Sequence, residues 1–191
     1  DSVCAEALLK YDLTPVLSHK SQIEILKNHV AENTRLPVHI KINTGMQRLG
    51  FEPEDIPATL DLLAKSQHLQ IDGLCTHLVA SEDAEKTHEQ ITLFSEVCDL
   101  LKKKWKQPFA AHVLNSGGIL SGGGPAFDMA RPGISLYGSS PAKNLKSKAS
   151  GLLQVMTLKS QLAFIHKVRK GKSVSYGGTW TAPEDSVVGV V

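Results

Sequence analysis

The sequence has few cysteines, and this limits the kinds of protein that it can encode. Only Cys4, Cys75 and Cys98 occur among 191 residues, and no Cys-x-x-Cys pair is present. An odd number of widely spaced cysteines argues against a disulfide framework and against a zinc site. We therefore expect a cytoplasmic protein, kept in a reducing compartment, that holds no metal ion.

Long apolar runs and an excess of one charge are also lacking. No stretch approaches the roughly 20 apolar residues of a membrane span, and the first residues do not resemble a signal peptide. The 21 Lys and Arg residues nearly balance the 19 Asp and Glu residues. Neither a nucleic acid nor a membrane surface is therefore an expected partner. The chain begins DSVCAEALLK, inside an amphipathic pattern and without a methionine, so we expect that it is cut at its start.

Apolar runs and amphipathic segments alternate over the first 140 residues. Period-2 and apolar runs predict strands at 13–18, 37–42, 69–79 and 110–115. Helical spacing predicts helices at 4–12, 21–33, 53–66 and 83–105. The remainder is predicted to be a loop at 116–127 and a last short strand and turn at 127–138. Such alternation predicts a parallel sheet with right-handed crossovers. The pattern alone allows a barrel or an open doubly wound sheet.

The chain changes character after about residue 140. Residues 143–151 are a polar connector, and apolar residues then alternate from Met156 to Phe164 before the turn signals RKGK and YGG. This pattern predicts antiparallel strands that belong to a second domain. We place the first domain at residues 1–140 and the start of the second at residues 141–191.

Polar groups follow successive predicted strands of the first domain. They are Lys41 and Arg48, then His77, then Asn115 and Ser116, then Arg131 and Gly133. Because the carboxyl ends of parallel strands share one face of the fold, we expect these groups to converge. The small, donor-rich turns NSGG and RPGI come after the last two strands, where barrels commonly bind phosphate. The residues alone thus predict a phosphate-bearing ligand beside two arginines and a histidine.

Each of these groups also has a structural interpretation. Lys41 could extend from a strand rim to solvent, His77 could be a hydrogen-bonded core histidine, and NSGG could be a helix N-cap turn. Arg131 could belong to a surface turn, and GGG at 122–124 is expected to be loop. The other histidines are treated as surface or structural, namely His19, His29, His39, His68, His88 and His166. The joint placement at strand ends favours a binding site.

Four motifs resemble those of the alanine racemase family. They are KINTGMQRLGF, THLVASED, HVLNSGGIL and RPGISLYG, in this order. The segment VMTLKSQLAFIHKVRKGKSVSYGGTW resembles the start of that family's C-terminal β domain. The resemblance implies a pyridoxal-phosphate (PLP) enzyme of fold type III, with a TIM-type (β/α)8 barrel followed by an antiparallel β domain. This chain would supply about strands 4 to 8 of the barrel. It also implies a homodimer that interconverts L- and D-alanine for peptidoglycan.

The resemblance gives several residues a role toward the cofactor. Arg131 would hold the pyridine nitrogen of PLP, and His77 would pack against the ring. The phosphate would be bound by Ser116 with backbone N–H groups near Gly133 and Ile134. His112 and Asn115 resemble residues that support Arg131.

The stretch after the 37–42 strand resembles the family's substrate-binding turn. Arg48 would contact the cofactor phenolate and lie near the substrate carboxylate. Lys41 resembles a lysine that is often carbamylated, and the resulting anion would orient Arg48. Asn43 stands where the family usually has aspartate, and an asparagine can still cap this turn.

The resemblance also implies that two catalytic groups lie outside the sequence. The family's Schiff-base lysine would precede residue 1 and its catalytic tyrosine would follow residue 191, so we expect these 191 residues alone to be inactive. Three alternatives stay open: a racemase for serine or another small amino acid, a non-catalytic PLP-binding fragment, and a phosphate-binding barrel without PLP.

Overall fold

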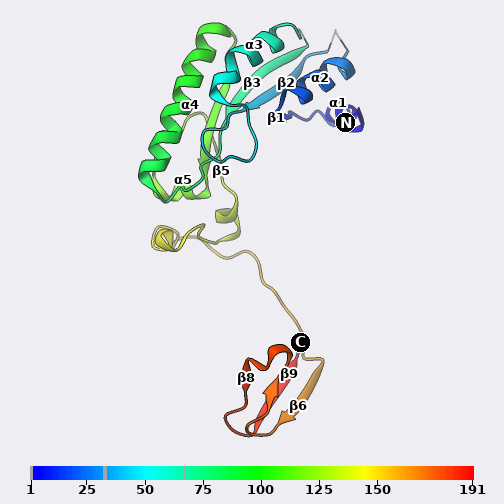
Figure 1. Ribbon diagram of the computed structural model, residues 1–191, viewed down its shortest axis with the longest axis vertical. Helices are drawn as coiled ribbons and strands as arrows, with labels where there is room; N and C mark the ends of the chain where they lie inside the picture. The colour runs from blue at the N-terminus through cyan, green and yellow to red at the C-terminus, as the bar shows by residue number, and fades with distance from the viewer. Residues whose placement is uncertain (1, 32–33, 67) are drawn as a thin grey trace. The chain divides into compact units, whose positions relative to one another are not determined.

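The computed structural model describes residues 2–31, 34–66 and 68–191. The chain divides into two compact units, Asp1–Val155 and Met156–Val191. The larger unit contains helices and strands, whereas the smaller contains strands and short turns (Figure 1). No helix within the described ranges combines the length and the apolar character needed to cross a membrane.

A parallel sheet of five strands forms the centre of the larger unit. The strands are β1 (Val16–Leu17), β2 (Leu36–Lys41), β3 (Leu69–Cys75), β4 (Ala110–Asn115) and β5 (Met129–Arg131). Each strand pairs in parallel with the strand that follows it in the chain, so the order across the sheet is β1-β2-β3-β4-β5. All five carboxyl ends therefore lie at one edge of the sheet.

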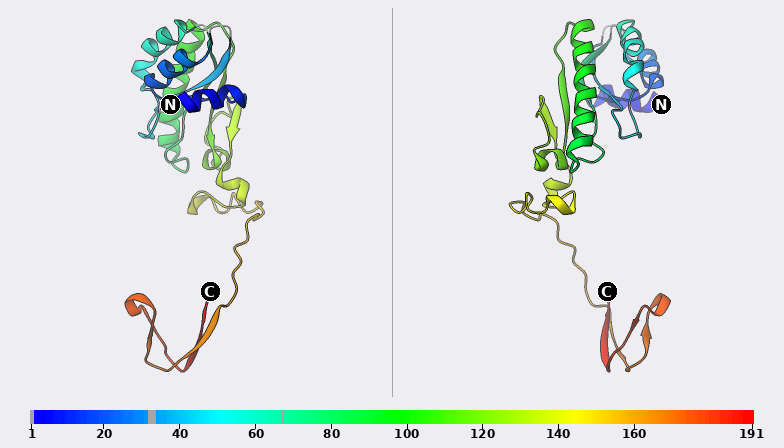
Figure 2. Two further views of the ribbon diagram at one scale, coloured as in Figure 1. Left: turned by 90° about the vertical axis from the view of Figure 1, so that its right-hand side faces the viewer. Right: turned by 60° about the vertical axis from the view of Figure 1, so that its left-hand side comes forward.

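Helices connect the strands. They are α1 (Ser2–Lys10), α2 (Lys20–His29), α3 (Ile56–Ala64), α4 (Ala84–Lys104) and α5 (Ser116–Ser121), with a short 3-10 turn η1 (Pro53–Asp55) before α3. Figure 2 shows α2, α3 and α4 on the same side of the sheet. A parallel sheet with its helices on one side is the arrangement of part of a (β/α)8 barrel, which confirms the predicted fold class.

The two faces of the sheet differ in polarity, as β2 illustrates. Val38 and Ile40 are buried among the helices with Phe94 of α4. His39 and Lys41 alternate with them and lie partly buried on the opposite face. Since side chains alternate between the faces of a strand, the apolar set faces the helices and the polar set faces the side that a complete barrel encloses.

The predicted loop at 116–127 is wrong at its start, because Ser116–Ser121 forms helix α5. The Asn115 side chain accepts a hydrogen bond from the Gly118 N–H, at 2.9 Å, and so caps the helix. Gly122 ends it in the left-handed conformation, at φ +69°. A cap at each end thus allows a helix despite two glycines.

The predicted extents of several other elements were also wrong. The strand predicted at 13–18 is reduced to Val16–Leu17, and the strand predicted at 69–79 ends at Cys75. The helix predicted at 21–33 ends at His29, because Val30 has an extended backbone; residues 32 and 33 lie outside the described residues. The alternating residues 156–163 form no strand, and Leu158 is fully exposed there.

The smaller unit is antiparallel, as predicted. Strands β6 (Phe164–Val168) and β9 (Ser186–Val190) pair with each other, and β7 (Ser173–Val174) pairs with β8 (Trp180–Thr181). Short 3-10 turns complete the chain at η2 (Ile134–Tyr137), η3 (Lys143–Leu145) and η4 (Tyr176–Gly178).

The loop after β2 folds back on its own strand. The Phe51 N–H donates to the Lys41 carbonyl, at 2.8 Å, and the Asn43 N–H donates to the Phe51 carbonyl, at 2.9 Å. The Asn43 side chain accepts from the Gln47 N–H, at 3.0 Å, so asparagine does cap this turn. The fold-back brings the segment that carries Arg48 to the carboxyl end of the strand.

We predict that Gly50→Ala destabilises the fold by about 1–3 kcal/mol. Gly50 has φ +134°, and a Cβ there would lie 2.6 Å from the Asn43 nitrogen. Gly151→Ala is the matched control, because a Cβ at Gly151 meets nothing within 4 Å. Urea unfolding followed by circular dichroism measures both, and equal unfolding midpoints for the two variants would contradict the prediction.

Candidate active site

A pocket of about 250 Å³ opens at the carboxyl ends of the strands, and its lining includes Lys41, His77, His112 and Arg131. Lys41, His77 and Arg131 come from three strand ends, as the sequence predicted for a common face, and His112 comes from within β4. Cys75 and Thr76 complete the wall between them. The structure therefore brings Lys41, His77 and Arg131 together in one cavity, whereas the predicted Arg48 is not among the lining residues.

Arg131 is held by three hydrogen bonds through its two terminal nitrogens. Nη2 donates to the carbonyls of Thr76 and Val113, and Nη1 donates to Nδ1 of His112. Among the residues that the structure describes, none accepts a hydrogen bond from Nε of Arg131. The guanidinium thus joins the ends of β3, β4 and β5, and two of its five N–H groups, one on Nε and one on Nη1, remain for another partner.

His112 connects Arg131 to a second histidine. Its Nε2 lies 2.8 Å from Nδ1 of His39, and Nε2 of His39 lies 3.9 Å from Oδ2 of Asp72. Burial and then the charge of Arg131 lower the pKa of His112 to about 4. Burial is also the main cause that lowers the pKa of His39. Both imidazoles are therefore neutral at pH 7.

His77 lies in a cationic environment. Burial lowers its pKa, and the charges of Arg131, Lys41 and Arg48 act in the same direction. A neutral ring among three cations is suited to stacking on a flat, electron-poor group, while the cations attract anions. Arg48 itself is exposed, and its neighbour Leu49 lines the pocket.

Ser116 forms a polar cluster with the turn after β5. Its hydroxyl oxygen accepts from the Gly133 N–H, at 2.7 Å, from the Ser135 N–H, at 3.2 Å, and from the Ser135 hydroxyl, at 3.1 Å. Ile134 lies between these two amides. Several N–H and O–H donors therefore meet at the ends of β4 and β5, where the sequence predicted a phosphate site.

The Asn115 side chain bonds to its surroundings and not to the Arg131 guanidinium. Besides capping α5, its Nδ2 donates to the Leu78 carbonyl, at 3.3 Å. Asn115 thus fixes the loop after β3 against the start of α5, one residue before Ser116.

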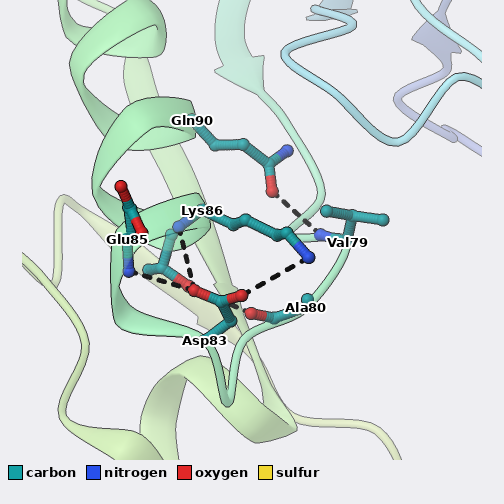
Figure 3. Close-up of polar contacts among 7 residues, drawn as sticks. Val79, Ala80, Asp83, Glu85, Lys86 and Gln90 are labelled. Atoms are coloured by element: carbon teal, nitrogen blue, oxygen red, sulfur yellow. Dashed lines mark hydrogen bonds and ion pairs between the residues drawn. The ribbon is translucent and has the colours of Figure 1, made fainter.

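Gln90 is a site residue that sequence reasoning missed. From α4, its Nε2 donates to Oγ1 of Thr44 and to the His77 carbonyl, each at 3.1 Å, and its Oε1 accepts from the Val79 N–H, at 2.9 Å. Figure 3 shows this side chain reaching from the helix to Val79. One buried amide therefore holds the loop that follows β2 to the loop that follows β3.

The same region of α4 has a strong N-cap. Asp83 accepts from the N–H groups of Glu85, at 3.1 Å, and Lys86, at 3.2 Å, and lies 3.4 Å from the Lys86 ammonium (Figure 3). The backbone hydrogen bond from Lys86 is the main cause that lowers the pKa of Asp83. This cap fixes where α4 starts, and hence where Gln90 points.

His39 was also missed, because it was treated as surface or structural. A signal was present, since His39 lies two residues before Lys41 in one strand and therefore shares its face. Asp72 gave no such signal.

Comparison with known proteins assigns the family. Residues 2–141 match the model of the alanine racemase N-terminal domain, and residues 155–191 match that of the alanine racemase C-terminal domain. The chain belongs to the alanine racemase family, as the motifs predicted.

Individual relatives agree with this assignment. The chain is 38% identical to an alanine racemase of Thermodesulfovibrio yellowstonii over 187 residues, covering 97% of this chain and 48% of that protein. Solved alanine racemases of Pseudomonas aeruginosa and Streptomyces coelicolor, each 28% identical, have TM-scores of 0.84 and 0.85. They cover 99% and 97% of this chain, and it covers 50% of each. The chain thus spans about half the length of the relatives that it matches.

We predict that acidification destabilises the fold through these histidines. His39, His77 and His112 have pKa values below 6.5 in the folded state. Below about pH 6.5 the unfolded chain therefore binds protons that the folded chain excludes, and stability falls as the pH approaches 4. Urea unfolding midpoints measured from pH 7 to pH 4.5 report this loss.

Two variants test the assignment to His112, whose pKa is lowered to about 4. His112→Asn should flatten the pH dependence, because asparagine can accept from Arg131 without titrating. The exposed His88 on α4 supplies the control variant His88→Asn, which should keep the parent's slope. Parallel curves for His112→Asn and the parent would refute the assignment.

Proposed function

We propose that the complete protein interconverts L-alanine and D-alanine with PLP. In this proposal the chain supplies contacts to the cofactor ring nitrogen, the cofactor phosphate and the substrate carboxylate. The arrangement of Arg131 carries the proposal. Its two terminal nitrogens donate to protein acceptors, and its Nε–H is a donor still available to a ring nitrogen at the pocket wall.

The donor set of the site fits PLP. The cluster of Ser116 with the Gly133 and Ser135 amides offers hydroxyl and N–H groups of the kind that bind phosphate oxygens. His77 is partly buried at the pocket wall, where it can pack on a flat ring. Phosphate, ring and ring nitrogen each have a matching group among Ser116, His77 and Arg131.

Bound PLP supplies the electron sink that lets an amino acid release its Cα proton. Arg131 tunes that sink, because a guanidinium keeps its proton at neutral pH and disfavours protonation of the ring nitrogen beside it. A weaker sink suits simple proton exchange over transamination. The neighbouring Arg48 adds positive charge that attracts the substrate carboxylate.

We assign Arg48 to the substrate carboxylate and the cofactor phenolate. The fold-back of residues 43–50 supports this role, because it returns Arg48 to the strand end that carries Lys41. Lys41 is the candidate for carbamylation, which would turn a cation into an anion able to pair with Arg48.

Other features of the proposal concern the complete protein. The two bases that exchange the Cα proton, a lysine and a tyrosine, are assigned to parts outside residues 1–191. We assign residues 1–140 to the barrel domain and 141–191 to the β domain, which the separate family matches at 2–141 and 155–191 support. The protein would act as a cytoplasmic homodimer that provides D-alanine for peptidoglycan.

Intact mass spectrometry, before and after borohydride reduction, tests the proposal. A mass above that of the 191 residues, with a reduced PLP adduct, together with racemisation of L-alanine, is the expected result. A mass equal to these residues alone, without an adduct, would identify a core fragment that cannot perform the reaction. Faster racemisation of L-serine than of L-alanine would overturn the substrate assignment.

We predict that Ser116→Ala weakens PLP binding by roughly 10- to 100-fold, the effect of losing a hydrogen bond to a charged group. Ser121→Ala is the matched control in the same helix, because the Ser121 hydroxyl donates to the Gly118 carbonyl and is not part of the cluster. Absorbance titration of the complete apoprotein with PLP measures both affinities. Equal affinity for the two variants would contradict the phosphate assignment.

A further inference from the structure

We propose that His39 and Asp72 are positioning residues that set the orientation of the Arg131 guanidinium through His112. The inference rests on the proposed function, since Arg131 acts there on the ring nitrogen. It extends the site by two residues on β2 and β3 that lie away from the phosphate cluster.

The direction of each hydrogen bond follows from Arg131. A guanidinium can only donate, so Nδ1 of His112 must accept from Nη1. His112 therefore carries its proton on Nε2 and donates it to Nδ1 of His39, 2.8 Å away. His39 in turn carries its proton on Nε2, the nitrogen that faces the Asp72 carboxylate at 3.9 Å. Both neutral imidazoles thus have one required tautomer.

The contact between Asp72 and His39 lies at a register shift between β2 and β3. Val38 pairs with Ile71, but the next residue, His39, pairs with Gly73, so Asp72 is an additional residue on β3. Bulges are uncommon between parallel strands, and they re-aim side chains near active sites. The shift places Gly73 directly opposite His39, and the Asp72 carboxylate lies 3.9 Å from Nε2 of His39.

Gly73 provides the space in which the His39 ring lies. A Cβ on Gly73 would come within 2.6 Å of three ring atoms of His39, which is closer than real Cβ contacts allow. The ring therefore packs directly on the β3 backbone. This close contact limits the rotation of the imidazole and keeps its Nδ1 toward His112.

Asp72 favours the direction in which His112 donates to His39 and His39 donates toward the carboxylate. Its negative charge favours an N–H on the facing nitrogen of His39. With the opposite tautomer, Nδ1 of His39 would donate to His112, and Nδ1 of His112 would then point a hydrogen at the Arg131 guanidinium. Because the Asp72 side chain is 56% exposed and that of His39 only 14% exposed, solvent weakens the effect of the carboxylate, and His39 should matter more.

Nitrogen-15 NMR of histidine in the complete protein tests the tautomers before PLP is added. We expect His39 and His112 to be neutral at pH 7 with the proton on Nε2 in each. A proton on Nδ1 of either ring would overturn the proposal. Asp72→Asn should increase the Nδ1–H form of His39, and an unchanged tautomer in that variant would overturn the role of Asp72.

Kinetics of the holoenzyme test the consequence for Arg131. His39→Leu removes the acceptor for His112 and should lower kcat about tenfold, the scale of one buried hydrogen bond, with KM for alanine within about twofold of the parent. His39→Asn places an amide oxygen near the position of Nδ1 and should restore kcat to within about threefold. Asp72→Asn should lower kcat about two- to threefold.

Two kinetic results would contradict the proposal that His39 positions Arg131. One is a kcat of His39→Leu equal to that of the parent. The other is a His39→Asn variant that folds normally but is no faster than His39→Leu, which would indicate a packing role alone. A parent protein without racemase activity would overturn the proposed function instead, because the tautomers are measured without substrate or cofactor.

Discussion

The site depends on one partly buried cation, the guanidinium of Arg131. An ionised group removed from water is destabilising unless acceptors replace its hydration. Here the carbonyls of Thr76 and Val113 and the imidazole of His112 supply them. Because these acceptors come from β3 and β4 while Arg131 ends β5, satisfying the charge also fixes the relative positions of three strand ends. The loops that carry the other ligand contacts start from those ends.

Burial of neutral polar groups completes the site on either side of Arg131. Gln90 joins the loops after β2 and β3 through three hydrogen bonds, and Ser116 joins the start of α5 to the turn after β5. Each network restricts the movement of the loops that it joins, because a broken hydrogen bond would leave a buried donor or acceptor unpaired. The positions of the groups in the proposed site thus depend on many neutral hydrogen bonds around a few charged side chains.

The sequence predicted the order of the elements better than their ends or their contacts. Period-2 and helical spacing were enough to predict the parallel sheet, and the polar residues at strand ends were enough to predict that Lys41, His77 and Arg131 meet in one pocket. His112 entered only through the family resemblance. The helix at Ser116 was missed because its two glycines disfavour a helix that its caps nevertheless form. The alternation at 156–163 predicted a strand, but pairing requires a neighbouring strand, which alternation does not supply.

Contacts that depend on strand register could not be predicted from the sequence. Asp72 lies beside His39 at the register shift between β2 and β3, and nothing in the period-2 pattern of either strand marks that shift. Gln90 was not predicted as a site residue for another reason. On a helix, a buried glutamine looks like any polar residue next to the apolar stripe, and its partners belong to loops whose paths depend on the whole fold. His39 is different, since its shared face with Lys41 could have been recognised.

The sequential strand order has a consequence for synthesis. In the five-stranded sheet each strand from β2 to β5 pairs with the strand made just before it, so every new strand of this sheet that leaves the ribosome meets a partner that is already present. The sheet can then grow in one direction as translation proceeds, without waiting for distant segments. During this growth the latest strand always exposes its outer N–H and C=O groups, and it stays vulnerable to pairing with another nascent chain until the next strand arrives.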